Sequence, residues 1–434
     1  EYPLGIGILG TLLTRAGHEV RIHDMAVDPT LLEEVVSAAR PDITGLSFLS
    51  TSSGLAGEVL RQLADLPAGH LVAGGIHATI FPEHVLELGA HVVVRGEGEP
   101  VLIPLMDALS RVRPGGPYNE ALSSVPGLAW RDGVGGFKST APAADDVDLD
   151  ALPVVDRDLY DLARYPHHSV ISSRACVHRC RFCCAWGPGG RRGRSASPAR
   201  VAREFTDIAL RYGPGTVYMA DDMFFFDRRR RVEFCEILRS LRLPIRWVAQ
   251  LRAPDLDPEL AALMRDAGCD KVCIGAESGS DRVLVASGKG IRAKHIARAV
   301  AAARHAGLRI KTWWIVGLPG GDVVEERRTI ELIERSRPDE VALHAFVPLP
   351  GSEFWDRARD HGIERPAMGS LERLFYYGSS GDLHPTHLPI GVMEALFEEF
   401  RSRLEDSGYV PAERATAADR YVYMSPGQAR TFSV

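Results

Sequence analysis

Three cysteines in one short stretch have the residue type and spacing for metal chemistry. Cys176, Cys180 and Cys183 form a C-x3-C-x2-C pattern, and the aromatic Phe182 directly precedes the third cysteine. This spacing lets one loop place three thiolates around one face of an iron–sulfur cube, which leaves one iron without a protein ligand. An open iron can bind a substrate or cofactor directly and transfer an electron to it.

Zinc is the competing occupant of this loop. A structural zinc site needs a fourth Cys or His at short range, and Cys184 and His178 are both available along the sequence. A disulfide would suit an exported protein, and we identify no export signal in the sequence.

The three-cysteine loop resembles the signature of the radical S-adenosylmethionine (SAM) enzymes. In that family the methionyl part of SAM chelates the fourth iron, and electron transfer to SAM releases a 5′-deoxyadenosyl radical. The resemblance implies a [4Fe-4S] cluster held by Cys176, Cys180 and Cys183. It also implies SAM as a second cofactor, a small-molecule substrate and a reducing partner such as flavodoxin or ferredoxin.

The composition limits the class of protein further. At 434 residues the chain is long enough for two domains, each with its own buried core. The net charge of −6, with both signs mixed, favours neither nucleic acid nor an anionic membrane as a partner, and we interpret Arg191–Arg194 and Arg228–Arg231 as solvated surface. No apolar run approaches the roughly 20 residues of a membrane-spanning helix. Four of the seven cysteines crowd into one loop, so we expect a reducing compartment, the cytoplasm.

The first third of the chain alternates helices and strands, with glycine-rich turns after the strands. This alternation predicts an α/β fold with a doubly wound, Rossmann-like parallel sheet, whose ligand lies at the carboxyl ends of the strands. The predicted helices cover residues 5–16, 30–39, 54–66 and 100–111, and the predicted strands cover residues 19–23, 43–48, 71–73 and 92–94.

The segments GLSFLSTS, GGIHATIFPE and RGEGE resemble the cobalamin-binding domain that precedes many radical SAM domains. The Asp-x-His-x-x-Gly motif of that family is absent, so the resemblance does not indicate a histidine ligand below cobalt. The chain opens at Glu1, where the family has already completed a first, central strand, so we expect a truncated or a reduced sheet. A bound cobalamin and a scaffold without corrin therefore both remain open for residues 1–112. A linker with a hairpin follows over residues 113–165.

The central third repeats strand–helix units and predicts a partial (β/α)6 barrel over residues 166–360. Six repeats fill about 180 residues, whereas a complete eight-unit barrel takes about 250. Residues 361–434 form a short tail with a helix at 390–406, which could cap the barrel. The predicted strands lie at or near residues 169–172, 217–220, 245–250, 271–274, 309–316 and 340–343.

The carboxyl ends of barrel strands converge on one mouth, so the residues there are expected to share a ligand. By resemblance, Asp221 and Asp222 stand where the family binds the SAM ammonium, Arg252 meets the methionyl carboxylate, and Glu277 with Ser278 binds the ribose. Each has a plainer interpretation; Asp221 could cap a helix and Arg252 could be a surface cation. The implied SAM contacts are Phe182, Asp221, Asp222, Arg252, Gly275, Glu277, Ser278, Gly317 and Leu318.

Acid–base residues near the same mouth are candidates for the substrate side. We predict catalytic roles for Asp222, His344 and Glu353, one of which would assist a departing hydroxyl. One of Trp313 and Trp314 should point into the barrel and the other toward the helices, and the sequence does not decide which.

Three functions fit these features. The first is a radical dehydration or deoxygenation of an amino-sugar-like natural product without cobalamin, as in relatives from aminoglycoside biosynthesis. The alternative is a cobalamin-dependent radical SAM C-methyltransferase. The third, from another class, is a non-catalytic iron–sulfur sensor.

Overall fold

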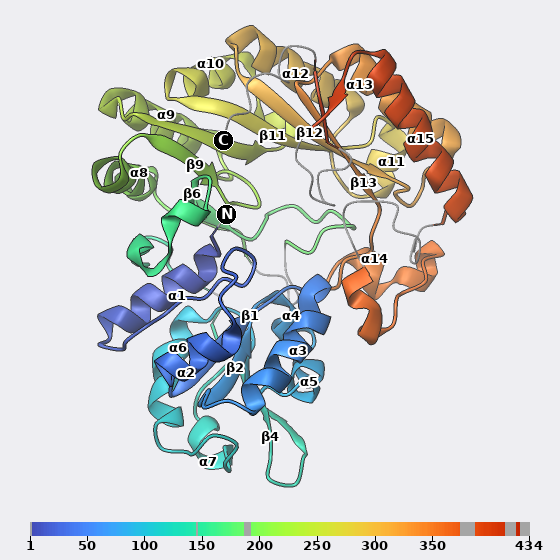
Figure 1. Cartoon of the computed structure of the whole chain (residues 1–434). Coiled ribbons are helices and arrows are strands. Elements are labelled where there is room, and N and C mark those ends of the chain that lie inside the picture. Colours follow the sequence, from blue (N-terminus) through green and yellow to red (C-terminus); the bar gives the residue numbers. More distant parts are fainter. Residues whose placement is uncertain (1, 145, 186–191, 374–386, 413–421, 426–434) are drawn as a thin grey trace. The chain divides into compact units, whose positions relative to one another are not determined.

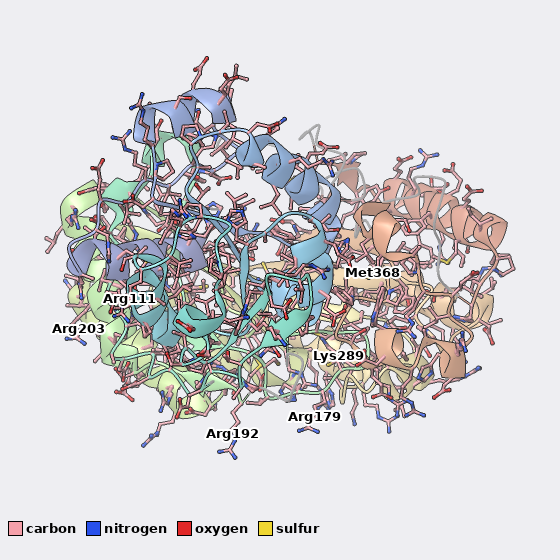
Figure 2. All side chains as sticks on the ribbon, turned by 90° about the horizontal axis from the view of Figure 1, so that it is seen from below. Arg111, Arg179, Arg192, Arg203, Lys289 and Met368 are labelled. Atoms are coloured by element: carbon pink, nitrogen blue, oxygen red, sulfur yellow. The ribbon has the colours of Figure 1, made fainter. Side chains whose placement is uncertain are left out.

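A computed structural model gives the fold of the chain and describes residues 2–144, 146–185, 192–373, 387–412 and 422–425. Figure 1 draws the ribbon and Figure 2 the side chains. The chain divides into two compact units. The N-terminal unit consists of residues 2–165 and 367–373, and the barrel unit contains residues 166–366 and the described residues after 386.

The N-terminal unit is built on a five-stranded sheet in the order β1-β2-β3-β4-β5. The first three strands are parallel, β4 runs antiparallel to β3, and β4 and β5 form the predicted hairpin. Strands β2 and β3 are buried on both faces, which explains their continuous apolar sequence. The strands are β1 (Ile43–Ser47), β2 (His70–Gly74), β3 (Val92–Val94), β4 (Leu128–Arg131) and β5 (Phe137–Ser139).

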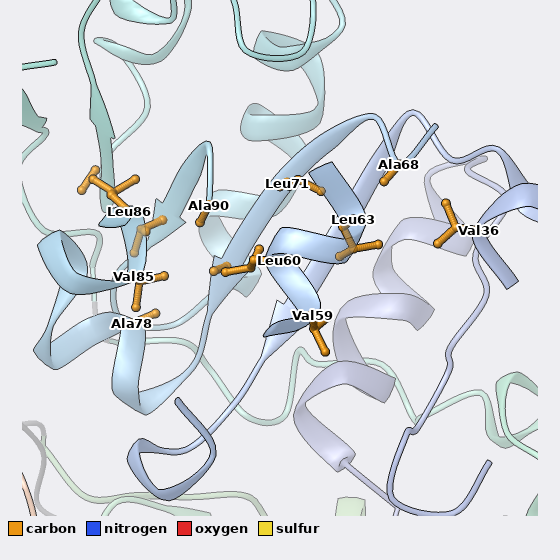
Figure 3. Packing of buried hydrophobic residues seen from close by; sticks show 13 residues of the cluster. Val36, Val59, Leu60, Leu63, Ala68, Leu71, Ala78, Val85, Leu86 and Ala90 are labelled. Carbon is orange, nitrogen blue, oxygen red and sulfur yellow. The ribbon is translucent and has the colours of Figure 1, made fainter. Parts of the chain in front are cut away.

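Helices cover both faces of this sheet, as a Rossmann-like fold requires. On one face α2 to α5 pack onto a core that includes Leu60, Leu71 and Val85 (Figure 3). On the other face α6 and α7 cover Val92 and Leu128. The helices are α1 (Leu4–Arg15), α2 (Leu32–Ala39), α3 (Ser53–Ala64), α4 (Ile76–Ile80), α5 (Pro82–Glu87), α6 (Glu99–Leu109) and α7 (Asn119–Leu122), with the 3-10 turns η1 (Ser50–Ser52), η2 (Arg157–Leu159), η3 (Leu162–Arg164) and η6 (Met368–Arg373).

The prediction of a strand over residues 19–23 is wrong. This segment has no regular secondary structure, because no strand of the described residues lies beside it to share backbone hydrogen bonds. Its apolar side chains Val20 and Ile22 instead pack near Gly10 of α1. An alternating pattern specifies a strand only where a neighbouring strand is available.

The barrel unit contains the six predicted parallel strands, in the order β6-β9-β10-β11-β12-β13. An antiparallel pair, β15 and β14, extends the sheet beyond β13. A separate two-stranded ladder, β7 with β8, brackets the cysteine loop. The strands are β6 (His168–Val170), β7 (Ser173–Arg174), β8 (Arg194–Ser195), β9 (Gly215–Met219), β10 (Ile245–Leu251), β11 (Cys269–Glu277), β12 (Arg309–Val316), β13 (Glu340–Ala345), β14 (Val410–Pro411) and β15 (Val422–Met424).

Helices connect these strands and begin at side-chain caps. The predicted start of α8 is confirmed, since Ser197 accepts a hydrogen bond from the Arg200 amide and Pro198 occupies the first turn. The helices are α8 (Pro198–Tyr212), α9 (Arg228–Leu241), α10 (Pro258–Asp266), α11 (Asp281–Ala286), α12 (Ala293–Ala306), α13 (Val323–Ser336), α14 (Glu353–Asp356) and α15 (Ile390–Asp406), with η4 (Ala253–Asp255) and η5 (Ala358–His361).

The register between β11 and β12 shows which face of the sheet each of the two tryptophans occupies. A Cβ built on Gly275 would meet the side chains of Glu277 and Lys289, so Gly275 lies on the face of β11 that carries these groups. Trp313 pairs with Gly275 and shares that face. Trp314 lies on the opposite face, fully buried.

Candidate functional site

The cysteine loop lies over the carboxyl ends of the last barrel strands. The Arg181 amide donates to the Ser287 carbonyl at 2.9 Å, and the Arg181 carbonyl accepts from the Phe354 amide at 2.9 Å. Cys180 and Phe182 are both 8% exposed and belong to one apolar cluster. The cluster also contains Val283, Ile315, Leu318, Phe346, Phe354, Ala358 and Ile363, with Cys183 packed against it.

The three cysteines of the motif are free thiols in a protected setting. Burial raises the pKa of Cys176, Cys180 and Cys183 above the ordinary thiol value. For Cys180 the largest opposing influence is the charge of Lys289, which lowers the pKa. Binding a metal requires thiolates, so loading this loop would release protons.

The donor set fits an iron–sulfur group. Soft thiolates are the protein ligands of such clusters, and the apolar wall beside Cys180 and Cys183 limits water around them. Concerning the zinc alternative, no three His, Cys, Asp or Glu side chains of the described residues are grouped to hold a single metal ion.

Lys289 is a site residue that the sequence analysis missed. Its ammonium lies 2.7 Å from Glu277 Oε1, and both side chains are buried. It also lies 5.7 Å from the centre of the Phe182 ring, within cation–π range. The only signal in the sequence is a lone cation between Gly288 and Gly290, two residues with positive φ.

Arg252 reaches the same group of residues from the end of β10. Its Nη1 lies 2.8 Å from Nε2 of His178, and its Nη2 donates to the Lys289 carbonyl. Burial and the Arg252 charge lower the pKa of His178. A permanently charged guanidinium can only donate, so His178 is a neutral acceptor in this contact.

The two adjacent aspartates after β9 have different surroundings. Asp221 is buried and accepts hydrogen bonds from the Ser172 amide at 2.6 Å, the Ser172 hydroxyl at 2.7 Å and the Ser173 amide at 2.8 Å. Burial raises the pKa of Asp221 to about 7. Through these hydrogen bonds Asp221 holds the segment after β6 against the end of β9, so its role in the structure is to position that segment.

Asp222, in contrast, is exposed and interacts electrostatically with cysteines of the loop. Surrounding protein atoms raise its pKa to about 6 by desolvation. Its charge in turn raises the pKa of Cys176, Cys183 and Cys184, which places the carboxylate close to these thiols. Asp222 is thus the aspartate of the pair that could meet a ligand at the cysteine loop.

The first turns of α13 hold the loop that follows β11. The Gly279 amide donates to Thr329 Oγ1 at 2.9 Å, and the Ser280 hydroxyl donates to Glu325. A Cβ on Gly279 would lie 2.3 Å from the Arg328 carbonyl oxygen, so the backbone approach requires glycine. Ser278, buried at 2% exposure, is fixed in the same contact region.

Glu326 of α13 holds the loop that follows β12. Its Oε1 accepts from the Gly317 amide at 2.9 Å, and burial raises its pKa to about 8. Leu318 is fully buried in the apolar cluster with Cys180 and Phe182. The loop with the predicted SAM contacts Glu277 and Ser278 and the loop with Gly317 and Leu318 therefore share one helix as support.

The remaining predicted residues lie on three different elements. His344 is buried on β13, in register with Ile315. Glu353 lies in α14, with a carboxylate oxygen 3.4 Å from Arg181 of the cysteine loop. Gly275 lies beside Glu277, as the sequence predicts for neighbouring strand-end residues.

The loops after β1 and β2 meet in the N-terminal unit. Gly75 has φ of 93°, and a Cβ there would lie 2.8 Å from Ser47 Oγ. His77 is fully buried, with Nδ1 3.0 Å from Ser50 Oγ and Nε2 3.1 Å from Nδ1 of His84. Burial and the His84 charge lower the pKa of His77 to about 4, so the ring is a neutral brace between the loops.

Comparisons with known proteins match both units. Residues 1–104 match the family profile described as B12 binding domain, and residues 170–333 match that of the Radical SAM superfamily. The uncharacterized methyltransferase PH0819 of Pyrococcus horikoshii is 29% identical over 367 residues, covering 82% of this chain and 78% of that protein. The hopanoid C-3 methylase of Methylococcus capsulatus is 26% identical over 414 residues, covering 89% and 73%.

Other matches broaden the range of relatives. An anaerobic magnesium-protoporphyrin IX monomethyl ester cyclase of Cereibacter sphaeroides is 28% identical over 380 residues, covering 82% of this chain and 60% of that protein. Among solved structures, the methyltransferase TsrM from Kitasatospora setae, with cobalamin and a [4Fe-4S] cluster bound, superposes with a TM-score of 0.74 at 17% identity. The superposition covers 92% of this chain and 86% of TsrM, which supports the same fold.

The fold and the three-thiol loop therefore define a radical SAM protein, and the chain belongs to the radical SAM superfamily. Within it, the chain is an enzyme of the group that carries a B12-binding domain before the radical SAM domain. Membership implies a [4Fe-4S] cluster and SAM as cofactors. No helix of the described residues is long and apolar enough to cross a membrane.

Proposed function

We propose that the chain is a cobalamin-dependent radical SAM methyltransferase acting on a small molecule. The observation that carries the proposal is the presence of a B12-binding match and a three-cysteine radical SAM loop on one chain. The names of PH0819 and of the hopanoid C-3 methylase support methyl transfer. The chain spans well over two thirds of both relatives, so the likeness is not confined to one domain.

Of the functions considered from the sequence, methylation is better supported than dehydration. The relatives reported above are methyltransferases, a methylase and a cyclase by name, and none of these is a dehydratase. The likeness to the cyclase supports ring formation as a second candidate outcome of the same radical step. The cytoplasm, with an acidic electron carrier as reducing partner, suits thiolate ligands and a reduced cluster.

The chain's own residues would organise this chemistry at the mouth of the barrel. When bound, the cluster with SAM supplies an electron and a 5′-deoxyadenosyl radical, and a corrin supplies the methyl group. Cys176, Cys180 and Cys183 would hold the cluster, and the wall around Phe182 would keep water away from it.

Charged groups beside the loop would bind and orient SAM. Asp222 would accept hydrogen bonds from the ammonium group of SAM, and Arg252 would pair with the methionyl carboxylate of SAM. Glu277, held by Lys289, would accept from the ribose hydroxyls. Asp221 would act one step away, by fixing the segment between β6 and the cysteine loop.

Anaerobic reconstitution tests the proposal in two stages. Wild-type protein, Cys180→Ala and the control Cys184→Ala are loaded with iron and sulfide, and iron content and 5′-deoxyadenosine formation from SAM with titanium(III) citrate are measured. We expect Cys184→Ala to match wild type and Cys180→Ala to lose both. Cluster binding and 5′-deoxyadenosine formation in Cys180→Ala would contradict the ligand assignment.

The second stage separates methylation from the cobalamin-free route. The loaded protein is incubated with hydroxocobalamin and SAM labelled in its methyl group, and the corrin is recovered by gel filtration and analysed by mass spectrometry. Co-eluting corrin that carries the label is expected. Formation of 5′-deoxyadenosine without any retained corrin would favour dehydration instead.

A further inference from the structure

We infer that the inner face of the barrel binds an acidic group of the substrate, and that Lys311 is the residue that holds this group. The inference rests on the proposed function, in which a small molecule lies beside SAM, and it adds the chemical class of that molecule. We use the name inner face for the side of strands β10 to β13 that carries Gly275 and Trp313, opposite to the side that carries Trp314.

The two sides of this sheet differ in burial. On β12 the alternate residues Ile310, Thr312 and Trp314 are fully buried, beneath helices such as α12, which packs against the strand (Figure 1). On the inner face, Lys311 and Trp313 are only partly buried. These two side chains of the inner face are therefore accessible to a ligand.

Lys311 lies in a row of polar side chains that crosses the inner face. The register pairs it with Cys273 of β11 and with Glu340 of β13. Cys273 in turn pairs with Gln250 of β10, whose side-chain amide donates to the Tyr218 hydroxyl at 2.7 Å. The row thus combines a cation with neutral hydrogen-bonding groups, which is a suitable environment for a carboxylate or a phosphate group.

The ammonium of Lys311 has no carboxylate within ion-pair distance among the described residues. Glu340, its neighbour in the register, is engaged by Lys271, whose Nζ lies 3.0 and 3.2 Å from the two carboxylate oxygens. A partly buried ammonium has lost part of its hydration, so an anionic group of a ligand would compensate it. The other cations on the inner face of β10 to β12 all contact a carboxylate; they are Arg246, Lys271 and Arg309.

Trp313 supplies an apolar surface beside this charge. Nζ of Lys311 lies 5.9 Å from the centre of the Trp313 ring, within cation–π range. The neighbours of Trp313 in the register are Gly275 and Ala342, so no long side chain at these two positions covers the ring. A substrate with an acidic group and a flat or apolar body would place the acid at Lys311 and the body on the indole.

This arrangement places the substrate next to the predicted ribose site. A Cβ on Gly275 would meet Glu277 Oε1, so the predicted ribose acid adjoins the position that pairs with Trp313. Lys311 lies two residues before Trp313, about 6–7 Å farther from the mouth along the strand. A molecule anchored by its acidic group at Lys311 would therefore present a carbon near Trp313 to SAM bound at Glu277.

Calorimetric titration with matched probes tests the inferred subsite. The cluster-loaded protein, with SAM bound and without reductant, is titrated anaerobically with 2-naphthylacetate, with its neutral amide 2-naphthylacetamide and with 2-naphthyl phosphate. Bound SAM occupies Arg252 with its own carboxylate, and no turnover takes place without a reductant. The variants are Lys311→Met, Lys311→Arg and Trp313→Leu, and the matched control is Lys294→Met, at an exposed position of α12.

We expect wild type to bind at least one of the two acids about tenfold more tightly than the amide, as a charge-assisted hydrogen bond would give. The acid that binds more tightly identifies a carboxylate or a phosphate as the group that the site accepts. Lys311→Met should lose the preference for the acid, whereas Lys311→Arg and Lys294→Met should keep it. Trp313→Leu should weaken the binding of all three probes by a similar factor.

Equal affinity of wild type for the acids and the amide, or no binding of any probe, would overturn the subsite, and this comparison needs no variant. A preference for acids that persists in Lys311→Met would also overturn it, because the anion would then lie elsewhere; the iron content shows whether each variant is folded. No 5′-deoxyadenosine from wild type with SAM and titanium(III) citrate would instead overturn the proposed function. The binding experiment contains no reductant, so the two failures are distinguishable.

Discussion

Lys289 Nζ and Glu277 Oε1 form a buried ion pair, 2.7 Å apart, beneath the cysteine loop. Burial alone would lower the pKa of Lys289, but the charges of Glu277 and Cys180 outweigh it and leave the pKa raised. The ammonium therefore stays charged and serves two neighbours at once, the predicted ribose acid and a predicted cluster ligand. Glu277 itself has φ of 64°, so the backbone there is held in an unusual conformation that the pair helps to maintain.

Replacing Lys289 by Met should destabilise the fold markedly. The change leaves the Glu277 carboxylate buried without its partner, which typically costs about 3–5 kcal/mol. Urea denaturation of the unloaded protein measures the free energy of unfolding. The double variant Glu277→Gln with Lys289→Met should recover much of the loss, because no unpaired charge remains. Strictly additive losses in the two single variants would contradict a direct pair.

Gly75 should not tolerate a side chain. Its φ of 93° and ψ of −170° lie in a region that is essentially restricted to glycine, and the new Cβ would meet Ser47 Oγ. We expect Gly75→Ala to lower the free energy of unfolding by about 1–3 kcal/mol and to weaken retention of hydroxocobalamin. Gly45→Ala is the control, since a Cβ there meets nothing within 4 Å. Equal effects of the two substitutions would refute the role given to the loop after β2.

Most helices and strands could be predicted from the sequence, because a parallel strand that is buried on both faces forms a continuous apolar segment. Val92–Val94 is such a run, and β13 of the barrel, Glu340–Ala345, is likewise buried along its whole length. Residues 19–23 carry an alternating apolar–polar pattern instead and fail to form a strand, because pairing depends on a neighbouring strand that local sequence cannot supply.

Site residues could be predicted from the sequence only where they belong to a short motif. The three cysteines mark themselves by spacing, whereas Asp221 and Asp222 look equivalent and differ only in what surrounds them. Lys289 was missed because its role comes from contact with Glu277 across a loop, and a lysine between two glycines has no pattern of its own. Long-range contacts of this kind are a property of the fold and not of a motif.

The pH dependence of SAM use should report Asp222. A pKa of about 6 means that the carboxylate is largely protonated below pH 6 and ionised above it. If the ionised form binds the SAM ammonium, kcat/KM for SAM should fall about tenfold for each pH unit below 6. In Asp222→Asn this slope should vanish along with most of the activity, whereas the exposed control Asp266→Asn should retain the wild-type profile. A wild-type profile that is flat between pH 5 and 7 would rule out this role.

Glu326 should make stability fall as pH rises. Burial lifts its pKa from 4.5 to about 8 in the folded chain, so the folded state keeps a proton that the unfolded state has lost across that interval. The raised pKa of Glu326 does not destabilise the fold below pH 4.5. Above that pH it lowers the free energy of unfolding by about 1.4 kcal/mol for each pH unit up to about pH 8, and the loss is constant above pH 8. Glu326→Gln keeps an acceptor for the Gly317 amide and cannot ionise, so its free energy of unfolding should exceed that of wild type increasingly from pH 5 to pH 8. Urea denaturation at several pH values, with the exposed Glu331→Gln as the matched control, measures the difference. A constant offset between Glu326→Gln and wild type at every pH would show that the carboxyl group ionises normally in the fold.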